Sequence, residues 1–447
     1  MDKVFSKKNW IILILFGVIG QIAWSVENMY FNLFVFVTIS PNLDTVTLMV
    51  QLSGITATVV TLFAGALSDK LGNRRKFISI GYIIWGITVA LFGFIETDLF
   101  VKVLDVDVVK ATAIALTVVV VGDCVMTVFG STANDAAFSA WITDNTEEEY
   151  RGKVEGVVAV LPLIAMLVVA GGFGILVSFV GYKGLFLGLG IVITIAGIVG
   201  LFTILDSEKL KANGSFKDIF YGFKPSVIKN NKPLYLTLII IGIYGISCQV
   251  FMPYLIIYMK TYLNFTVLEY SLVFGAAIIL GAIINVLLGG KTDKMDKTTV
   301  ITFANLIFIV GLILMYLFHL ENKIATIITF GIGGFIMIVG FILISALTGA
   351  LVRDYTPDEH AGKLQGVRMI FSVLIPMIIG PMIGNAINKA MNIPLVNAGA
   401  DAMTTEYIPA PEIFLVASLI SLLIFVVTPK LVKTVKSIKE SKNETSN

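Results

Sequence analysis

Stretches of about 20 predominantly apolar residues, the length of helix that crosses a bilayer core, recur along the whole chain. No other sequence feature constrains the fold as strongly. The predicted membrane spans cover residues 10–38, 45–67, 77–96, 109–140, 154–179, 184–204, 234–259, 269–290, 298–319, 324–352, 364–388 and 412–430. Because 57% of the residues are hydrophobic and only 14% are charged, these twelve spans leave no room for a soluble domain. We therefore expect an all-α membrane protein.

The distribution of lysine and arginine predicts the orientation of the chain. With the N-terminus inside, 25 of the 32 basic residues fall in internal segments and only six in external ones. The positive-inside rule predicts this bias for the correct topology, and the opposite orientation would violate it throughout. We expect a multi-pass protein of the cell (inner) membrane with both termini in the cytoplasm.

The longest internal connection divides the predicted spans into six and six. We predict an N-terminal six-helix bundle at 1–204, a cytoplasmic linker at 205–232, a C-terminal six-helix bundle at 233–432 and a cytoplasmic tail at 433–447. The aromatic residues of Phe216–Phe223, together with Lys217, would suit a short helix at a membrane surface. The alternative is that this segment is only a linker.

Two internal loops are repeated between the halves. The segment WITDNTEEEYRGKVEGV follows the fourth span and LVRDYTPDEHAGKLQGV follows the tenth. Asp144, Thr146, Glu149, Gly152, Lys153 and Gly156 match Asp354, Thr356, Glu359, Gly362, Lys363 and Gly366 without a gap. After the second and eighth spans, Gly65, Asp69 and Lys70 match Gly289, Asp293 and Lys294. Two repeated motifs at equivalent loops indicate duplication of a six-helix unit.

The first loop also resembles a family signature. GALSDKLGNRRK at 65–76 is similar to the loop 2–3 motif of the major facilitator superfamily, and helix number, orientation and repeats agree with it. The segment DNTEEEYRG and the preceding Asn-Asp-Ala run resemble the glycoside/sugar:cation symporter branch, which includes melibiose permease and the sucrose-transporter group. Span 5 lacks the Gly-Pro-x-x-Gly-Gly element typical of the drug/proton antiporter branch.

The resemblance implies a gating role for some charged loop residues. In the resembling fold, Asp69 would meet the start of span 11 and Asp293 the start of span 5, where a helix N-terminus favours an anion. We interpret Asp69, Asp293, Arg75 and Arg151 as gating residues that lock the internal side shut and separate when it opens. The alternative is that these charges only set the topology.

Two carboxylates lie deep within predicted spans. Glu27 is well inside span 1 and Asp123 is about halfway along span 4. An ionisable residue at membrane depth is costly and indicates a functional site, and transporters built from repeats bind solute near the midplane. We therefore predict that Glu27 and Asp123 bind substrate and couple its movement to a cation. Asp135 is nearer the internal end, and we interpret it as structural.

The neighbours of these carboxylates predict a binding cavity. Trp24 and Asn28 recur beside Glu27 on one face of span 1, and Thr127 follows Asp123 on a polar stripe of span 4. Tyr244 and Tyr254 belong to an aromatic stripe on span 7. Carboxylates accept hydrogen bonds from paired hydroxyls while aromatic rings cover the apolar face of a sugar. The alternative for the aromatic residues is helix packing.

These residues indicate a secondary active transporter that works by alternating access. Burial disfavours a charged carboxylate, so uptake of H⁺ or Na⁺ by the pair would remove the cost of reorienting bare charge. We expect symport of a sugar or related small polar solute; the alternatives are a proton-driven exporter of drugs or other lipophilic compounds and another small-solute carrier. Two isolated cysteines and two scattered histidines provide neither a metal site nor an enzyme's catalytic set. We expect no cofactor beyond the coupling ion, no nucleic-acid partner, and a functional monomer in the lipid bilayer.

Overall fold

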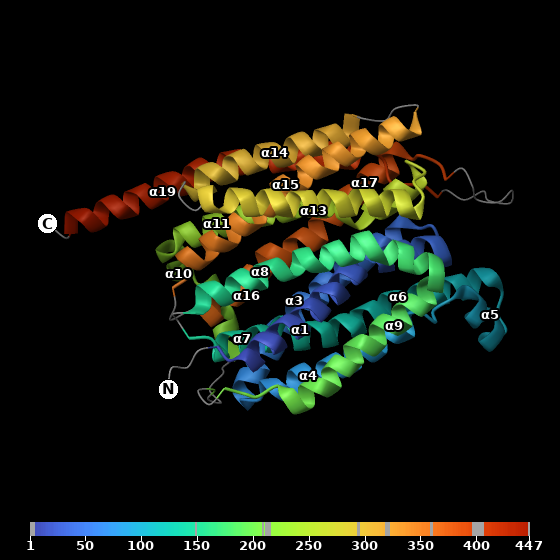
Figure 1. Ribbon diagram of the computed structural model, residues 1–447, viewed down its shortest axis with the longest axis horizontal. Coiled ribbons are helices and arrows are strands. Elements are labelled where there is room, and N and C mark those ends of the chain that lie inside the picture. The colour runs from blue at the N-terminus through green and yellow to red at the C-terminus, as the bar shows by residue number, and fades with distance from the viewer. Residues whose placement is uncertain are drawn as a thin grey trace. The chain divides into compact units, whose positions relative to one another are not determined.

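The computed structural model (Figure 1) describes residues 5–147, 150–207, 210, 216–292, 296–317, 322–357, 361–395 and 406–445. Helices account for nearly all of this part of the chain. It contains no strand, and its one isolated bridge joins Pro394 to Tyr407. The prediction of an all-α protein is confirmed.

Twelve long helical spans are present. Eleven helices of the described chain are long and apolar enough to cross a membrane, and one of them covers 48 residues from Gly156 to Thr203. Non-helical backbone at Gly181, with φ 68° and ψ 174°, breaks that stretch into two spans. A left-handed φ favours glycine, which explains the residue at this break. The predicted twelve-helix membrane fold is therefore confirmed.

Contacts between helices divide the chain into two compact units. Unit 1 contains Met1–Phe216, Pro253–Ser271 and Pro394–Ile408, and unit 2 contains Lys217–Met252, Leu272–Ile393 and Pro409–Asn447. The long elements of unit 1 are α1 (Lys7–Val26), α3 (Leu43–Leu71), α4 (Arg74–Phe92), α6 (Val108–Gly130), α8 (Arg151–Val168) and α9 (Gly174–Thr203). Its shorter helices are α2 (Asn32–Phe34), α5 (Thr97–Leu104), α7 (Ser139–Asn145) and α12 (Leu255–Thr261).

Unit 2 contains most of the second half of the chain. Its helices are α10 (Pro225–Asn230), α11 (Lys232–Phe251), α13 (Val267–Thr292, shared with unit 1 at its start), α14 (Lys297–Leu317), α15 (Lys323–Tyr355), α16 (Ala361–Met369), α17 (Ile375–Met391), α18 (Glu412–Ser421) and α19 (Ile424–Thr445). Helices α14 and α15 lie side by side, and α11 packs against α17 (Figure 1).

Glycines permit the close packing of α4 against α9 in unit 1 (Figure 1). A Cβ at Gly86 would lie 2.5 Å from the carbonyl oxygen of Gly190, and a Cβ at Gly190 would lie 2.4 Å from that of Gly86. Real Cβ atoms do not approach backbone so closely, so any side chain here would push the two helices apart.

Several membrane helices contain short π-helical segments. These are η1 (Glu27–Phe31), η2 (Val35–Ile39), η3 (Ser131–Phe138), η5 (Val169–Phe173) and η9 (Ile370–Leu374). The remaining short elements are the 3₁₀ segments η6 (Phe216–Phe223) and η7 (Met252–Tyr254). A π-turn inserts one residue into a helix and is frequent at functional sites. Segment η1 begins at the buried Glu27 and η3 contains the half-buried Asp135, so two acids of unit 1 lie where the helix geometry changes.

Candidate functional site: buried carboxylates of unit 1

Glu27 lies in the interior of unit 1, where α1 gives way to η1, and only 6% of it is exposed. The hydroxyl of Ser53, on α3, donates to Glu27 Oε1 over 2.7 Å. Thr127 Oγ1, on α6, lies 3.2 Å from the same carboxylate oxygen and 3.0 Å from Ser53 Oγ. Three helices therefore meet at one side of the Glu27 carboxylate.

Asp123 approaches the same place from α6, one turn before Thr127, and is 2% exposed. The Thr127 hydroxyl lies 2.8 Å from the Asp123 carbonyl oxygen, which joins the two residues through the backbone. Because Thr127 contacts Glu27, Asp123 lies one helical turn from that contact. Glu27 Oε2 and Asp123 Oδ1 are both buried and form no hydrogen bond within the described chain.

A second polar network surrounds Asp135 on η3. The Trp24 indole Nε1 and the Asn134 side-chain amide each donate to Asp135 Oδ1 over 3.2 Å. The Tyr82 hydroxyl, on α4, lies 2.9 Å from Asn134 Oδ1. Trp24 also contacts Trp85, with ring centroids 4.9 Å apart. Trp24 thus connects the second network to α1, only three residues before Glu27.

The three acids place several carboxyl groups within unit 1. Among the residues that the structure describes, no lysine or arginine forms an ion pair with Glu27, Asp123 or Asp135. Burying carboxylates without a counter-charge is strongly unfavourable, so the site is suited to take up a cation. The described residues contain no cluster of three or more metal-ligating side chains.

The predicted residues of the first half are partly brought together. Glu27 and Thr127 lie in one hydrogen-bond network with Ser53, and Asp123 joins it through its backbone carbonyl oxygen. The Trp24 indole donates its hydrogen bond to Asp135 and not to a residue of the Glu27 network. The Asn28 side chain donates to the Trp24 carbonyl oxygen over 2.8 Å, within its own helix.

The two tyrosines predicted on span 7 lie in different units. Tyr254 belongs to unit 1, is fully buried, and its hydroxyl lies 2.7 Å from Thr47 Oγ1. Tyr244 belongs to unit 2, where its hydroxyl donates to the Phe341 carbonyl oxygen over 3.0 Å. Each tyrosine hydroxyl thus forms a hydrogen bond to a neighbouring helix of its own unit.

Two residues of these networks, Ser53 and Asp135, are not among the predicted binding residues. Ser53 is one of many hydroxyl residues in the spans, and no spacing within α3 shows that it faces Glu27. The sequence does contain a feature that indicates a role for Asp135, because it is an acid within a span and follows Asn134 and Ser131 on the polar stripe of span 4.

A buried arginine organises the loop after α3. Arg74, the first residue of α4, is 3% exposed, pairs with Asp69, and places its Nε 2.9 Å from Asp144 Oδ2 at the end of α7. Its neighbour Arg75 is exposed, and its backbone N–H donates to Asp206 Oδ1. Arg74 is thus the arginine that contacts Asp69, and the gating role predicted for Arg75 stays a prediction.

The second half contains a related ion pair. Lys297, the first residue of α14, lies 2.5 Å from Asp354 Oδ2, and Asp354 is the repeat partner of Asp144. In each unit, the cation that begins the helix after the repeated loop therefore pairs with the matched aspartate. Asp293 lies outside the described residues. Arg151 begins α8, and its side chain is likewise outside the described part.

The chain also resembles known proteins. Among solved structures, it is similar to a bacterial homolog of the human lysosomal transporter Spinster in an inward-facing, unoccupied conformation, at 12% identity and TM-score 0.65, covering 96% of this chain and 98% of that one. It is similar to the nucleoside transporter NupG at 12% identity and TM-score 0.63, covering 95% and 98%. A bacterial metal transporter matches at 15% identity and TM-score 0.54, covering 96% and 99%. At these identities the likeness concerns the fold.

No curated relative matches the chain in sequence. A family model does match: the model described as Major Facilitator Superfamily covers residues 13–381 and, in a second match, residues 237–446. The twelve helical spans, the repeated loops and this match agree, and the chain belongs to the Major Facilitator Superfamily of membrane transporters.

Proposed function

We propose that this transporter couples the movement of a small polar solute, a sugar or a related polyol, to the entry of H⁺ or Na⁺. The observation that carries the proposal is the Glu27–Asp123 pair. Both side chains are buried, each retains a carboxylate oxygen without a hydrogen bond in the described chain, and no basic residue there pairs with them.

Electrostatics explains why such a pair would couple two fluxes. With both carboxylates ionised, the interior of unit 1 carries uncompensated charge that opposes any closed, dry state. Binding one cation at the pair reduces that charge, so reorientation becomes easier when the ion is bound. A solute hydroxyl bonded to Glu27 Oε2 or Asp123 Oδ1 would then make ion binding and solute binding mutually favourable.

The surroundings of the pair favour a hydroxylated solute over a purely lipophilic one. Ser53 and Thr127 supply hydroxyls beside Glu27, and the Trp85 indole N–H is a buried donor without a partner in the described chain. Trp24 and Trp85 add aromatic surface next to these polar groups. Aromatic surface combined with carboxylate and hydroxyl groups can bind both the apolar face and the hydroxyls of a sugar ring.

The charged loops support alternating access in this proposal. The Arg74–Asp69–Asp144 cluster and the Lys297–Asp354 pair lie at matched loops, which we assign to the cytoplasmic side of the inner membrane from the distribution of basic residues. Such clusters would stabilise one state of each unit and rearrange as the units rock.

A panel of mono- and disaccharides tests the function. The protein is reconstituted in vesicles that contain a pH-sensitive dye, with and without a sodium gradient, and cation entry is followed as each sugar is added. We expect entry with at least one sugar, and its loss in both Glu27→Gln and Asp123→Asn. Proton flux in response to lipophilic cations, with no response to any sugar, would contradict the proposal and favour an exporter.

A further inference from the structure

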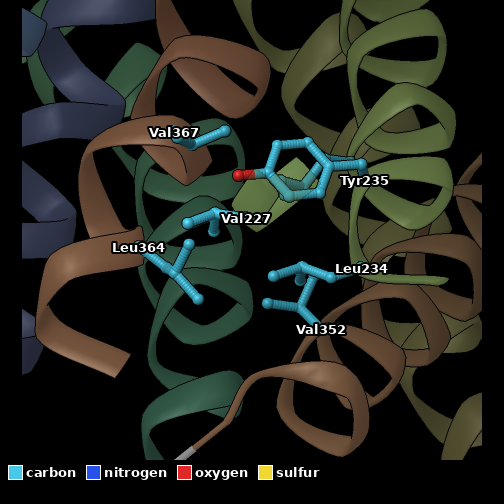
Figure 2. Close-up of a cluster of buried hydrophobic side chains, with 7 residues drawn as sticks. Val227, Leu234, Tyr235, Val352, Leu364 and Val367 are labelled. Carbon is cyan, nitrogen blue, oxygen red and sulfur yellow. The ribbon is translucent and has the colours of Figure 1, made fainter. Parts of the chain in front are cut away.

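The segment that precedes α11 has one face fixed to unit 2. Val227, on α10, is buried in a cluster with Leu234, Tyr235, Leu238, Val352, Leu364 and Val367. Figure 2 shows Val227 among side chains contributed by α11, α15 and α16. The Tyr235 hydroxyl donates to the Gly222 carbonyl oxygen, and a Cβ at Gly222 would lie 2.3 Å from a methyl carbon of Val367. Gly222 and Val227 therefore lie directly against α11 and α16.

The other face of the same segment exposes large apolar side chains. Phe220 is 65% exposed, Phe223 42% and Ile228 40%. Exposed apolar residues within a span face lipid, but these three precede the next span, which begins at Lys232. Their exposure outside the spans indicates a surface that another apolar environment covers.

Positive charge surrounds these apolar residues. Lys224, Lys229 and Lys232 are exposed, and residues 219–268 contain no aspartate or glutamate. Lys224 Nζ lies 5.6 Å from the centroid of the Tyr221 ring. Lys229 and Lys232 form no ion pair within the described chain. The linker face, defined as Phe220, Phe223, Lys224, Ile228, Lys229 and Lys232, is therefore amphipathic and purely basic.

We propose that the linker face binds the anionic phosphate headgroups of the membrane leaflet from which α11 enters the bilayer. Helix α10 ends at Asn230, two residues before that span, so this end of the linker face is next to the point where α11 enters the bilayer. Lysines at this depth attract anionic lipid, while phenylalanine and isoleucine insert at the boundary with the acyl chains.

Headgroup binding also has a structural consequence for unit 2. The buried side of the segment contacts α16 through Gly222 and Val227. Holding the linker on the bilayer should therefore also stabilise the position of α16. Anionic lipid is therefore expected to slow amide hydrogen exchange in α16 as well as in the linker. This inference does not depend on the transported solute.

The test places a reporter on the segment itself. Ser226 is exposed between the two lysine positions Lys224 and Lys229. A Ser226→Cys variant, with Cys124 and Cys248 replaced by alanine, carries a polarity-sensitive fluorophore and is placed in nanodiscs of phosphatidylcholine alone or with phosphatidylglycerol. We expect a blue shift of the emission in the anionic nanodiscs and slower amide exchange of α16.

Two variants that each remove three lysines show whether the lysines of the linker face cause the blue shift. In Lys224→Gln/Lys229→Gln/Lys232→Gln the blue shift should disappear, because each lysine changes the bound-to-free ratio by about fivefold. The control Lys102→Gln/Lys110→Gln/Lys389→Gln, which removes three exposed lysines elsewhere, should keep it. Equal emission in both nanodiscs, a shift that survives in the linker variant, or a shift caused by inorganic phosphate without anionic lipid would overturn the proposal.

Discussion

At the residue scale, the chemistry of the site depends on how the buried carboxylates are hydrogen-bonded. Ser53 donates to Glu27 Oε1, while Glu27 Oε2 has no partner in the described chain. Hydrogen bonds to charged groups contribute about 1.5–3 kcal/mol, so a single hydroxyl can change the ion affinity of the site by an order of magnitude or more.

The Ser53→Ala variant tests that hydrogen bond. Losing the donor leaves the ionised form of Glu27 less well solvated and favours its protonation. If Na⁺ is the coupling ion, the proton competes with it, and half-maximal transport at a fixed pH should need about tenfold more sodium. With protons as the ion, the same loss favours protonation and transport should persist to higher pH. The control is Ser79→Ala, since Ser79 Oγ is buried without a hydrogen bond in the described chain. An ion dependence equal in both variants would contradict the role of Ser53.

A second residue-scale prediction concerns Arg74. The Arg74→Gln variant leaves Asp144 and Asp69 without their shared cation. Because these aspartates are 23% and 48% exposed, the cost should fall below the about 3–5 kcal/mol of a fully buried pair. Thermal unfolding in detergent should therefore occur at a clearly lower temperature. Arg75→Gln removes an exposed arginine from the adjacent position and should change the unfolding temperature little. Equal effects would show that the Arg74 contacts do not stabilise the fold.

At the scale of elements, the contact between α4 and α9 depends on Gly86 and Gly190. Gly190→Ala should destabilise the protein by about 1–3 kcal/mol, because the added methyl group would meet Ala90 and the backbone of Gly86. Gly188→Ala is the matched control on the same helix, since a Cβ at Gly188 meets nothing within 4 Å. Unfolding measured in detergent or nanodiscs should separate the two variants, and a Gly188→Ala effect as large as that of Gly190→Ala would refute the packing argument.

Sequence patterns predicted the elements far better than the contacts between them. Apolar windows predicted the twelve spans because a bilayer requires long helices whatever the tertiary structure. Side-chain contacts were harder, since the predicted helix faces assumed 3.6 residues per turn throughout. The π-turn at η1 changes the phase of the helix after Glu27, and Asn28, expected beside Glu27, instead donates to the Trp24 carbonyl oxygen of its own helix. Arg74 is buried at the start of α4 while Arg75 is exposed. The loop motif does not show where α4 begins, so it does not predict which of the two arginines is buried.

At the scale of the whole molecule, the two units share matched charged loops but differ in their acids within the spans. Duplication explains the loops. Lys297–Asp354 in unit 2 corresponds to Arg74–Asp144 in unit 1, but Glu27, Asp123 and Asp135 all belong to unit 1. We expect unit 1 to couple the ion and unit 2 mainly to shape solute specificity. Substitutions confined to unit 2 that changed the coupling ion would count against this division.

The most direct test separates coupling from solute binding. Vesicles containing the wild type, Glu27→Gln or Asp123→Asn are assayed for two activities with the same sugar: exchange at equal concentrations on both sides, and uphill accumulation driven by an imposed ion gradient. We predict that at least one variant retains exchange while both lose accumulation, because a neutral side chain no longer needs the ion in order to reorient. Gradient-driven accumulation at the wild-type level in both variants would contradict the central claim that the Glu27–Asp123 pair couples ion and solute.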